Sequence, residues 1–142
     1  MSARYRFRET WSVPAPPEAI RDVLLDLESY PQWWPQVVAV ASLGPDDARV
    51  LCRSTLPYTL DLVLHAVSRE LPAVEVTVDG HLHGWVRWSL MPVPTGTEML
   101  LEQEVAVQGA LAPLAVLARP LLRWNHARMM AGGRAGLIRR LA

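Results

Sequence analysis

The 142-residue sequence predicts an α+β fold with one strand, two short helices, six antiparallel strands in series and a long C-terminal helix. Three observations carry this prediction. Polar and apolar residues alternate over residues 4–13, as is typical of a half-buried strand. Six strand-like segments separated by turn residues then follow between residues 37 and 108, and the tail from residue 112 has no such alternation. We expect a single domain over residues 1–142.

The first strand is expected over residues 4–13. Tyr5, Phe7, Trp11 and Val13 share one face of it, and polar residues occupy the other face. Pro14 ends the strand, because proline cannot donate a backbone hydrogen bond.

Two short helices are expected next. Pro16-Pro17-Glu18 gives a rigid start with an early acidic residue to a helix over residues 16–27, whose apolar residues recur at helical spacing. Ser29 is suited to cap a second helix that runs into Trp33. Pro35 closes that helix, because the residue before a proline is driven out of helical conformations.

Six strands are expected over residues 37–43, 50–55, 59–69, 74–79, 82–91 and 98–108. Proline, glycine and aspartate residues separate them, as hairpin turns require. None of the connections is long enough to hold a crossover helix, so each strand should pair with its sequence neighbour in an antiparallel meander.

The tail over residues 112–142 is rich in alanine, leucine and arginine and predicts a long C-terminal helix. Pro120 lies inside it, so either the helix bends there or a short leading helix ends there. The apolar stripe of this tail drifts along its length, and its members are Leu114, Leu117, Leu121, Met130, Leu137 and Leu141.

This order of elements resembles the helix-grip fold of the START-like (SRPBCC) superfamily, and within it the sequence is similar to the polyketide cyclase/dehydrase and lipid-transport family. Three segments carry the resemblance over essentially the whole chain. They are Val13-Pro14-Ala15-Pro16-Pro17-Glu18 between strand and helix, the aromatic segment Tyr30-Pro31-Gln32-Trp33-Trp34-Pro35, and Gly96-Thr97-Glu98 before the last strand.

The resemblance implies a curved antiparallel sheet of about seven strands wrapped around the last helix, with a cavity between them for an apolar or aromatic small molecule such as a lipid, polyketide or quinone. The family includes aromatase/cyclases, lipid carriers and quinone-binding proteins, so the fold by itself does not decide between catalysis and carriage.

Charge and cysteine content exclude several other classes of function. Lysine is absent, and 14 arginines balance 14 acidic residues, which gives no net field to attract nucleic acid or an anionic membrane surface.

No segment has the length of a membrane span or the form of a secretory signal, so we expect a cytoplasmic protein. Cys52 is the single cysteine and is expected to be a strand thiol. No cofactor is expected, and the oligomeric state stays open, a homodimer included.

Aromatic residues supply most of the candidate ligand contacts. The sequence has six tryptophans and one phenylalanine, and the tryptophans cluster near predicted turns. Indole is large and rigid and carries one donor, so tryptophans near a chain reversal often form the wall of a cavity. The candidate ligand-binding residues are Trp11, Trp33, Trp34, Arg53, Tyr58, His65, Trp88, Leu121 and Asn125.

Trp85 and Trp88 differ in parity and must lie on opposite faces of their strand. The apolar residues in phase with Trp88 favour its face as the inner one, where it either packs in the core or lines the cavity. Arg87 would then lie outside and pair with Glu102 or Glu104 on the next strand.

The candidate catalytic residues are His83, Glu9, His126 and Tyr58. Glu9 is in phase with the buried face of the first strand, where it could serve as a general acid or base, whereas a register shift would expose it. His81 and His83 share a strand face, as a two-histidine metal site needs, but no further ligand has a recognisable spacing, so no metal site is expected.

Asn125 and His126 lie in the C-terminal helix close to Trp124. If Asn125 faces the sheet, its amide could hydrogen-bond a ligand carbonyl. The alternative is that these polar groups are solvated or bond to neighbouring loops.

Three hypotheses about function follow. The first is a carrier of a hydrophobic or aromatic small molecule. The second is a polyketide cyclase or dehydratase that acts through general acid and base groups. The third is a protein-interaction module that exposes Trp33 and Trp34 as a patch.

Overall fold

The computed structural model describes residues 4–142, which form a seven-stranded antiparallel sheet in the order β1-β7-β6-β5-β4-β3-β2. The strands are β1 (Arg4–Val13), β2 (Val37–Ser42), β3 (Asp47–Arg53), β4 (Thr59–Ser68), β5 (Ala73–Gly80), β6 (Leu82–Val93) and β7 (Gly96–Val107). The helices are α1 (Pro17–Leu25), α2 (Tyr30–Trp33), α3 (Ala112–Leu117) and α4 (Arg119–Leu141), with 3₁₀ turns η1 (Leu27–Ser29) and η2 (Gly109–Leu111).

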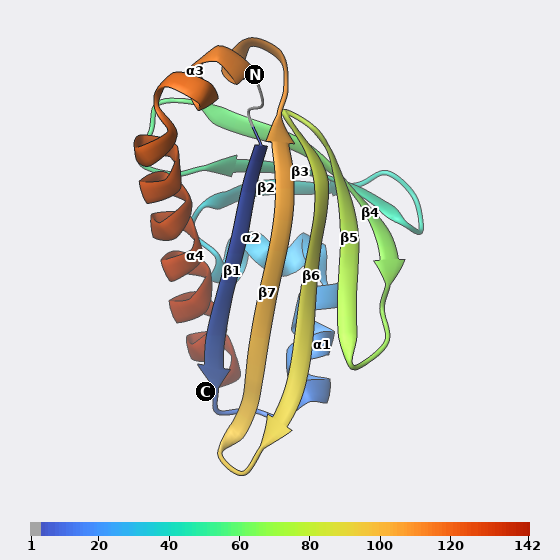
Figure 1. The fold of residues 1–142 in the computed structure, drawn as a ribbon. Coiled ribbons are helices and arrows are strands. Elements are labelled where there is room, and N and C mark those ends of the chain that lie inside the picture. The colour runs from blue at the N-terminus through green and yellow to red at the C-terminus, as the bar shows by residue number, and fades with distance from the viewer. Residues whose placement is uncertain (1–3) are drawn as a thin grey trace.

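The sheet is strongly curved. Strands β2 and β3 cross behind β1 and β7, α4 runs along the side of β1, α2 lies behind β7 and α1 lies behind β6 (Figure 1). The predicted helix-grip architecture, with two short helices after the first strand and a long C-terminal helix, is therefore confirmed. The sequence-neighbour pairing of β2 to β7 is confirmed too, and β1 closes the sheet by pairing with β7.

Pro120 does not bend a continuous helix. Helix α3 ends at Leu117, the chain breaks at Ala118, and Pro120 lies in the first turn of α4. The missing N–H of a proline is harmless there, because the first turn of a helix has no partner for it. The second of the two alternatives, a short leading helix that ends before the proline, is the observed one.

Several boundaries differ from the predicted ones. Helix α1 ends at Leu25, and β3 begins at Asp47 rather than at residue 50. Strands β6 and β7 are paired as far as Val93 and Gly96, and this hairpin is tighter than the predicted turn. Gly96 has a φ of 142°, which a residue with a side chain rarely adopts.

An aromatic cluster forms the core between the sheet, α2 and the second half of α4. The Trp11 ring lies 4.9 Å from that of Trp88 and 6.5 Å from that of Trp34, and the Trp33 and Trp34 rings are 5.5 Å apart. Tyr30 stacks on the same cluster. Such aromatic pairs add stability beyond the area they bury.

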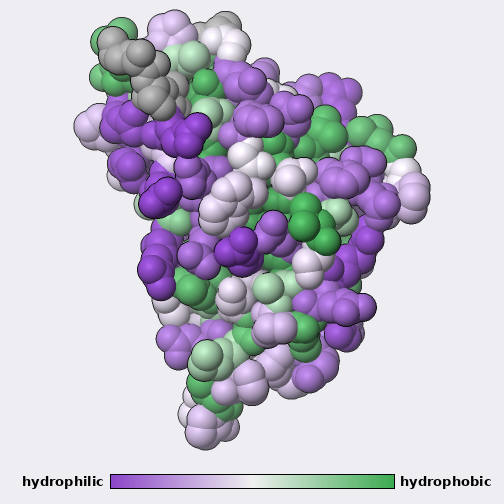
Figure 2. Space-filling model, turned by 45° about the vertical axis from the view of Figure 1, so that its right-hand side comes forward, coloured by the Kyte–Doolittle hydropathy of each residue, from purple (hydrophilic) through white to green (hydrophobic). Residues whose placement is uncertain are grey.

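The convex face of the sheet is polar. Figure 2 shows mainly hydrophilic side chains on the side of the molecule that it presents. Arg49 pairs with Asp61 at 2.6 Å, and Arg87 pairs with Glu75 on β5 at 2.6 Å. Of the two partners expected on β7, Glu102 lies opposite Arg87 and attracts it, whereas Glu104 is held by two arginines of β1.

Within residues 4–142, no helix is long and apolar enough to cross a membrane.

Candidate functional site

A cavity of about 400 Å³ lies between the inner face of the sheet and helix α4. Side chains alternate in direction along a strand, so every second residue of a strand faces inward. Strand β4 contributes Leu60, Leu62, Leu64 and Ala66 to the wall. Helix α4 contributes Leu122, Asn125, His126, Met129 and Met130.

Contacts on both sides of this wall fix the distance between α4 and the sheet. Towards the C-terminus, a Cβ on Gly133 would overlap the Trp34 ring and one on Gly136 would overlap the Trp33 carbonyl, so only glycine allows this approach. Before the start of α4, the Tyr5 hydroxyl donates a hydrogen bond of 2.6 Å to the Ala115 carbonyl. The cavity-lining residues of α4, from Leu122 to Met130, lie between these two contacts.

His126 is the most strongly perturbed polar group of the wall. Its ring stacks on Phe7 with 3.5 Å between centroids, and its Nε2 lies 3.0 Å from Oε1 of Gln103. An amide oxygen only accepts, so Nε2 carries the proton and donates it, which leaves Nδ1 with a free lone pair. Burial, with a smaller contribution from Arg123, lowers the pKa of His126 from 6.5 to about 4. The imidazole is therefore neutral at pH 7.

Asn125 fastens the loop between β3 and β4 to α4. Its Oδ1 accepts hydrogen bonds from the backbone N–H groups of Thr55 at 3.1 Å and Leu56 at 3.3 Å. The Asn125 side chain also hydrogen-bonds Tyr58. The loop alternative for Asn125 is therefore the observed one. Tyr58 lines the cavity, and desolvation raises the pKa of its hydroxyl, which stays protonated at pH 7.

The cavity wall includes five of the residues selected from the sequence, namely Trp34, Tyr58, Trp88, Asn125 and His126. Trp11 and Trp33 are buried but belong to the aromatic cluster and not to the wall. Trp88 belongs both to the core cluster and to the cavity wall, so core packing and cavity lining are both true of it.

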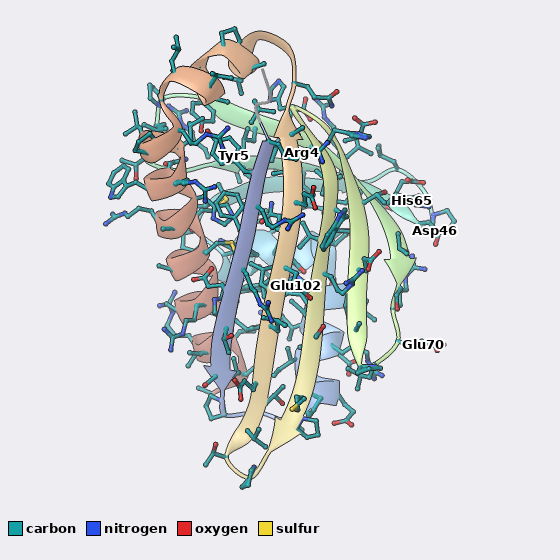
Figure 3. The ribbon with its side chains drawn as sticks, in the orientation of Figure 1. Arg4, Tyr5, Asp46, His65, Glu70 and Glu102 are labelled. Atoms are coloured by element: carbon teal, nitrogen blue, oxygen red, sulfur yellow. The ribbon has the colours of Figure 1, made fainter. Side chains whose placement is uncertain are left out.

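Other selected residues lie away from the cavity. His65 is exposed and pairs with Asp47 at 2.8 Å, because it alternates with the inward-facing leucines of β4. Figure 3 shows it on the side of the molecule opposite α4. Arg53 and Leu121 are exposed and are not part of the wall, since their neighbours Cys52 and Leu122 face inward instead.

The catalytic candidates His83 and Glu9 also lie outside the cavity. His83 is exposed on the convex face, where its Nδ1 is 3.7 Å from Asp79. Glu9 stays in register with Leu101 and is half-buried, so no register shift exposes it, but it is not part of the wall.

The predicted exposed patch at Trp33 and Trp34 is wrong, because both side chains are buried. The Trp34 indole donates a hydrogen bond of 2.9 Å to the Met129 carbonyl. Trp85 lies on the convex face, with the Arg87 guanidinium 5.0 Å from its ring centre. The interaction-module hypothesis thereby loses the feature that supported it.

Sequence reasoning missed Gln103, Phe7 and Cys52 as wall residues. Gln103 is in phase with the apolar residues Leu101 and Val105 of β7, and a polar residue in an apolar phase is the signal that could have found it.

Burial raises the pKa of the Cys52 thiol to about 12, so this thiol is unreactive at neutral pH. No group of three or more potential metal ligands occurs within residues 4–142.

Comparison with known proteins gives one family and many similar folds. A family model described as polyketide cyclase/dehydrase and lipid transport matches residues 13–132. The Zhui aromatase/cyclase from Streptomyces sp. R1128 superposes with a TM-score of 0.78 at 13% identity, over 97% of this chain and 93% of that one. A START superfamily protein from Mycobacterium smegmatis gives 0.69 at 19% identity, over 96% and 99%.

The di-domain aromatase/cyclase StfQ of the steffimycin biosynthetic pathway gives a TM-score of 0.70 at 15% identity, over 98% of this chain and 51% of that one. No curated protein matches the sequence. Identities this low establish a shared fold, and the cavity of this chain has to be interpreted from its own residues.

Proposed function

This chain belongs to the polyketide cyclase/dehydrase and lipid transport family, and we propose that it binds a hydrophobic or aromatic small molecule between its sheet and α4. The observation that carries the proposal is the cavity of about 400 Å³. Small-molecule sites have volumes of roughly 300–1,000 Å³, with mostly apolar walls and a few convergent polar groups. The cavity of this protein has both properties.

The polar groups of the wall indicate what the ligand carries. His126 and Gln103 form one hydrogen-bonded pair, and Tyr58 and Asn125 form another. A neutral imidazole with a free Nδ1 accepts a hydrogen bond, and a protonated tyrosine donates one. We therefore propose that the ligand has an apolar body and a hydroxyl or carbonyl group at this end of the cavity.

The same groups favour carriage over catalysis. General acid and base groups work best when their pKa is close to the working pH. Burial moves the pKa of His126 down to about 4 and that of Tyr58 above its ordinary value, so both move away from neutrality. A weak base beside a weak acid suits ligand recognition better than proton transfer.

A polyketide cyclase or dehydratase is the second candidate. The observation in its favour is that a proton acceptor, His126, and a proton donor, Tyr58, line one cavity. Cyclisation of a poly-ketone needs little more than orientation and one such pair. Under this hypothesis His126→Gln abolishes turnover of a model poly-ketone and leaves its affinity unchanged, whereas a carrier shows no turnover in either protein.

Binding of the uncharged fluorescent probe Nile red tests the proposal. The wild type should bind one probe with a shift of its emission to the blue. Leu64→Trp fills the cavity and should abolish binding, because Leu64 belongs to the wall. Val67→Trp is the matched control, since Val67 lies on the same strand, is exposed and is not part of the wall. Equal binding by all three proteins would contradict the proposal.

A further inference from the structure

Apolar side chains collect on one outer surface of the C-terminal helices. The other exposed large hydrophobic residues belong to different elements, namely α1, β2, the segment after β2, β4 and β6. By contrast, Leu114, Leu117, Leu121 and Trp124 are all exposed, and Leu117 is 84% exposed. Leu114 and Leu117 lie one turn apart on α3, and Leu121 and Trp124 lie one turn apart on α4, with the break at Ala118 between the two pairs. We call these four residues the apolar ridge.

The charged residues of the C-terminal segment are all of one sign. Residues 105–142 contain six of the 14 arginines and none of the 14 acidic residues, so the rest of the chain has eight arginines against 14 acidic residues. The zero net charge of the whole chain is therefore the sum of a basic C-terminal segment and an acidic remainder, so it does not exclude attraction of the C-terminal segment to an anionic surface. Arg123 and Arg128 are exposed beside the ridge, and the Arg128 guanidinium lies 5.8 Å from the Trp124 ring centre.

We propose that the apolar ridge docks on the surface of an anionic lipid membrane. A helix with leucine and tryptophan on one side and arginine around them is the composition that lies in the interface of a bilayer. Tryptophan favours the headgroup level, and each arginine adds attraction to anionic lipid. Helix α3 and the first turns of α4 form one tip of the molecule, so the ridge can reach a flat surface (Figure 1).

A second copy of the chain fits this surface less well. Two copies meeting symmetrically at the ridge would bring two basic helices together, and like charges at an interface are repulsive. A bilayer with acidic headgroups supplies both an apolar phase for the leucines and the opposite charge for the arginines.

The ridge is also continuous with the cavity. Leu114 is exposed and belongs to the cavity wall, and Leu122, in the same turn of α4 as Leu121, belongs to the wall too. An apolar ligand that leaves the bilayer beside Leu114 would pass from one apolar surface to another. This last step rests on the proposed function, whereas docking itself does not.

Sedimentation with vesicles tests docking without any cavity ligand. The vesicles are phosphatidylcholine alone, or phosphatidylcholine with about one quarter phosphatidylglycerol. The wild type should bind the anionic vesicles at least about tenfold more tightly than the neutral ones, and added salt should weaken this binding. Failure to bind anionic vesicles would overturn the proposal and leave the cavity proposal untouched.

Surface variants separate docking from simple charge attraction. Leu117→Ser should weaken binding to anionic vesicles by about tenfold, because one leucine no longer leaves water. Arg128→Gln should weaken it by about fivefold. Met91→Ser is the matched control, since Met91 is 66% exposed on β6 and its hairpin lies at the opposite end of the molecule. It should bind as the wild type does.

Three outcomes would overturn the proposal. Equal binding by Leu117→Ser and the wild type would show that charge alone attracts the protein. Equal weakening by Met91→Ser would show that the ridge has no special role. A dimer in sedimentation velocity that Leu117→Ser dissociates would assign the ridge to a second copy of the chain.

Discussion

The space between the sheet and α4 has a packed half and an open half, and the two differ in the side chains that meet there. In the packed half, Trp33 and Trp34 meet Gly136 and Gly133 of α4, and Trp11 packs against Trp34 from the sheet. In the open half, Leu60 of β4 and Leu122 of α4 both line a cavity, whose wall also includes Phe7 and Trp88. The comparison teaches that direct contact between tryptophan residues and the glycines of α4 closes this fold, and that the cavity lies where α4 has no such contact.

Two glycines of α4 help to hold this helix in place, although glycine usually destabilises a helix. Glycine destabilises a helix interior by about 1 kcal/mol relative to alanine. Gly133 and Gly136 nevertheless fix α4 against α2, because any Cβ there would meet Trp34 or Trp33. The contact they permit fixes one side of the cavity.

Truncation of Trp11 should have the largest effect on stability. Trp11→Ala removes a side chain that is 1% exposed and leaves a large void, so the free energy of unfolding should fall by about 4 kcal/mol. Leu60→Ala enlarges a cavity that already exists, and it should lower the same quantity by only about 1 kcal/mol. Urea unfolding of both variants measures the difference, and equal losses would contradict the division into two halves.

Substitution of Gly136 comes second. Gly136→Ala should lower the free energy of unfolding by about 3 kcal/mol, because the new methyl group overlaps the Trp33 carbonyl and forces α4 outward. Gly132→Ala is the helical control, since its Cβ meets only the side chain of Gln36, which is able to move. Thermal unfolding compares them. A Gly136→Ala protein as stable as the wild type would show that the close approach of α4 is not required.

Protonation of His126 gives the third effect. Because the pKa is about 4 in the folded protein and 6.5 ordinarily, the unfolded chain takes up the proton first as the pH falls. The free energy of unfolding should therefore fall between about pH 6.5 and pH 4, by about 3 kcal/mol, and should not change on this account above pH 6.5.

Urea unfolding of the wild type and His126→Gln across this range isolates that effect, because acidic residues titrate alike in both proteins. The wild type should lose more stability on acidification than the variant. Parallel pH profiles would mean that the imidazole is not desolvated.

Removal of the Asn125 amide should lower stability less than the Trp11 and Gly136 substitutions or the protonation of His126. Asn125→Ala leaves the backbone N–H groups of Thr55 and Leu56 without their acceptor and should lower the free energy of unfolding by about 1.5 kcal/mol. Amide hydrogen exchange should increase at these two residues and stay unchanged in β6 and β7. Unchanged exchange in the loop would show that Asn125 does not fasten it.

The architecture could be predicted from sequence because it depends on local patterns. Alternation in β1, turn residues between the later strands and the alanine-rich tail each act over a few residues. Strand parity also placed Trp88 inside and Trp85 outside, as observed. The same rule applied to His65 and Leu64 would have excluded His65 from the cavity.

The site was harder to predict because it depends on distances between elements. The sequence does not distinguish Trp11 from Trp34. The position of α4 decides that Trp11 only packs in the core, whereas Trp34 packs in the core and also lines the cavity. The pairing of Gln103 with His126 joins β7 to α4 across 23 residues of sequence. No spacing rule within one element reports such a pair.

Native mass spectrometry of the freshly purified protein tests the central claim most directly, since the claim is that the open half holds an apolar guest. The wild type and Val67→Trp should each carry a small molecule that organic solvent extracts, and Leu64→Trp should appear at the mass of the bare chain. A bare wild-type chain that also stays bare after incubation with apolar and aromatic hydroxyl compounds would contradict the account.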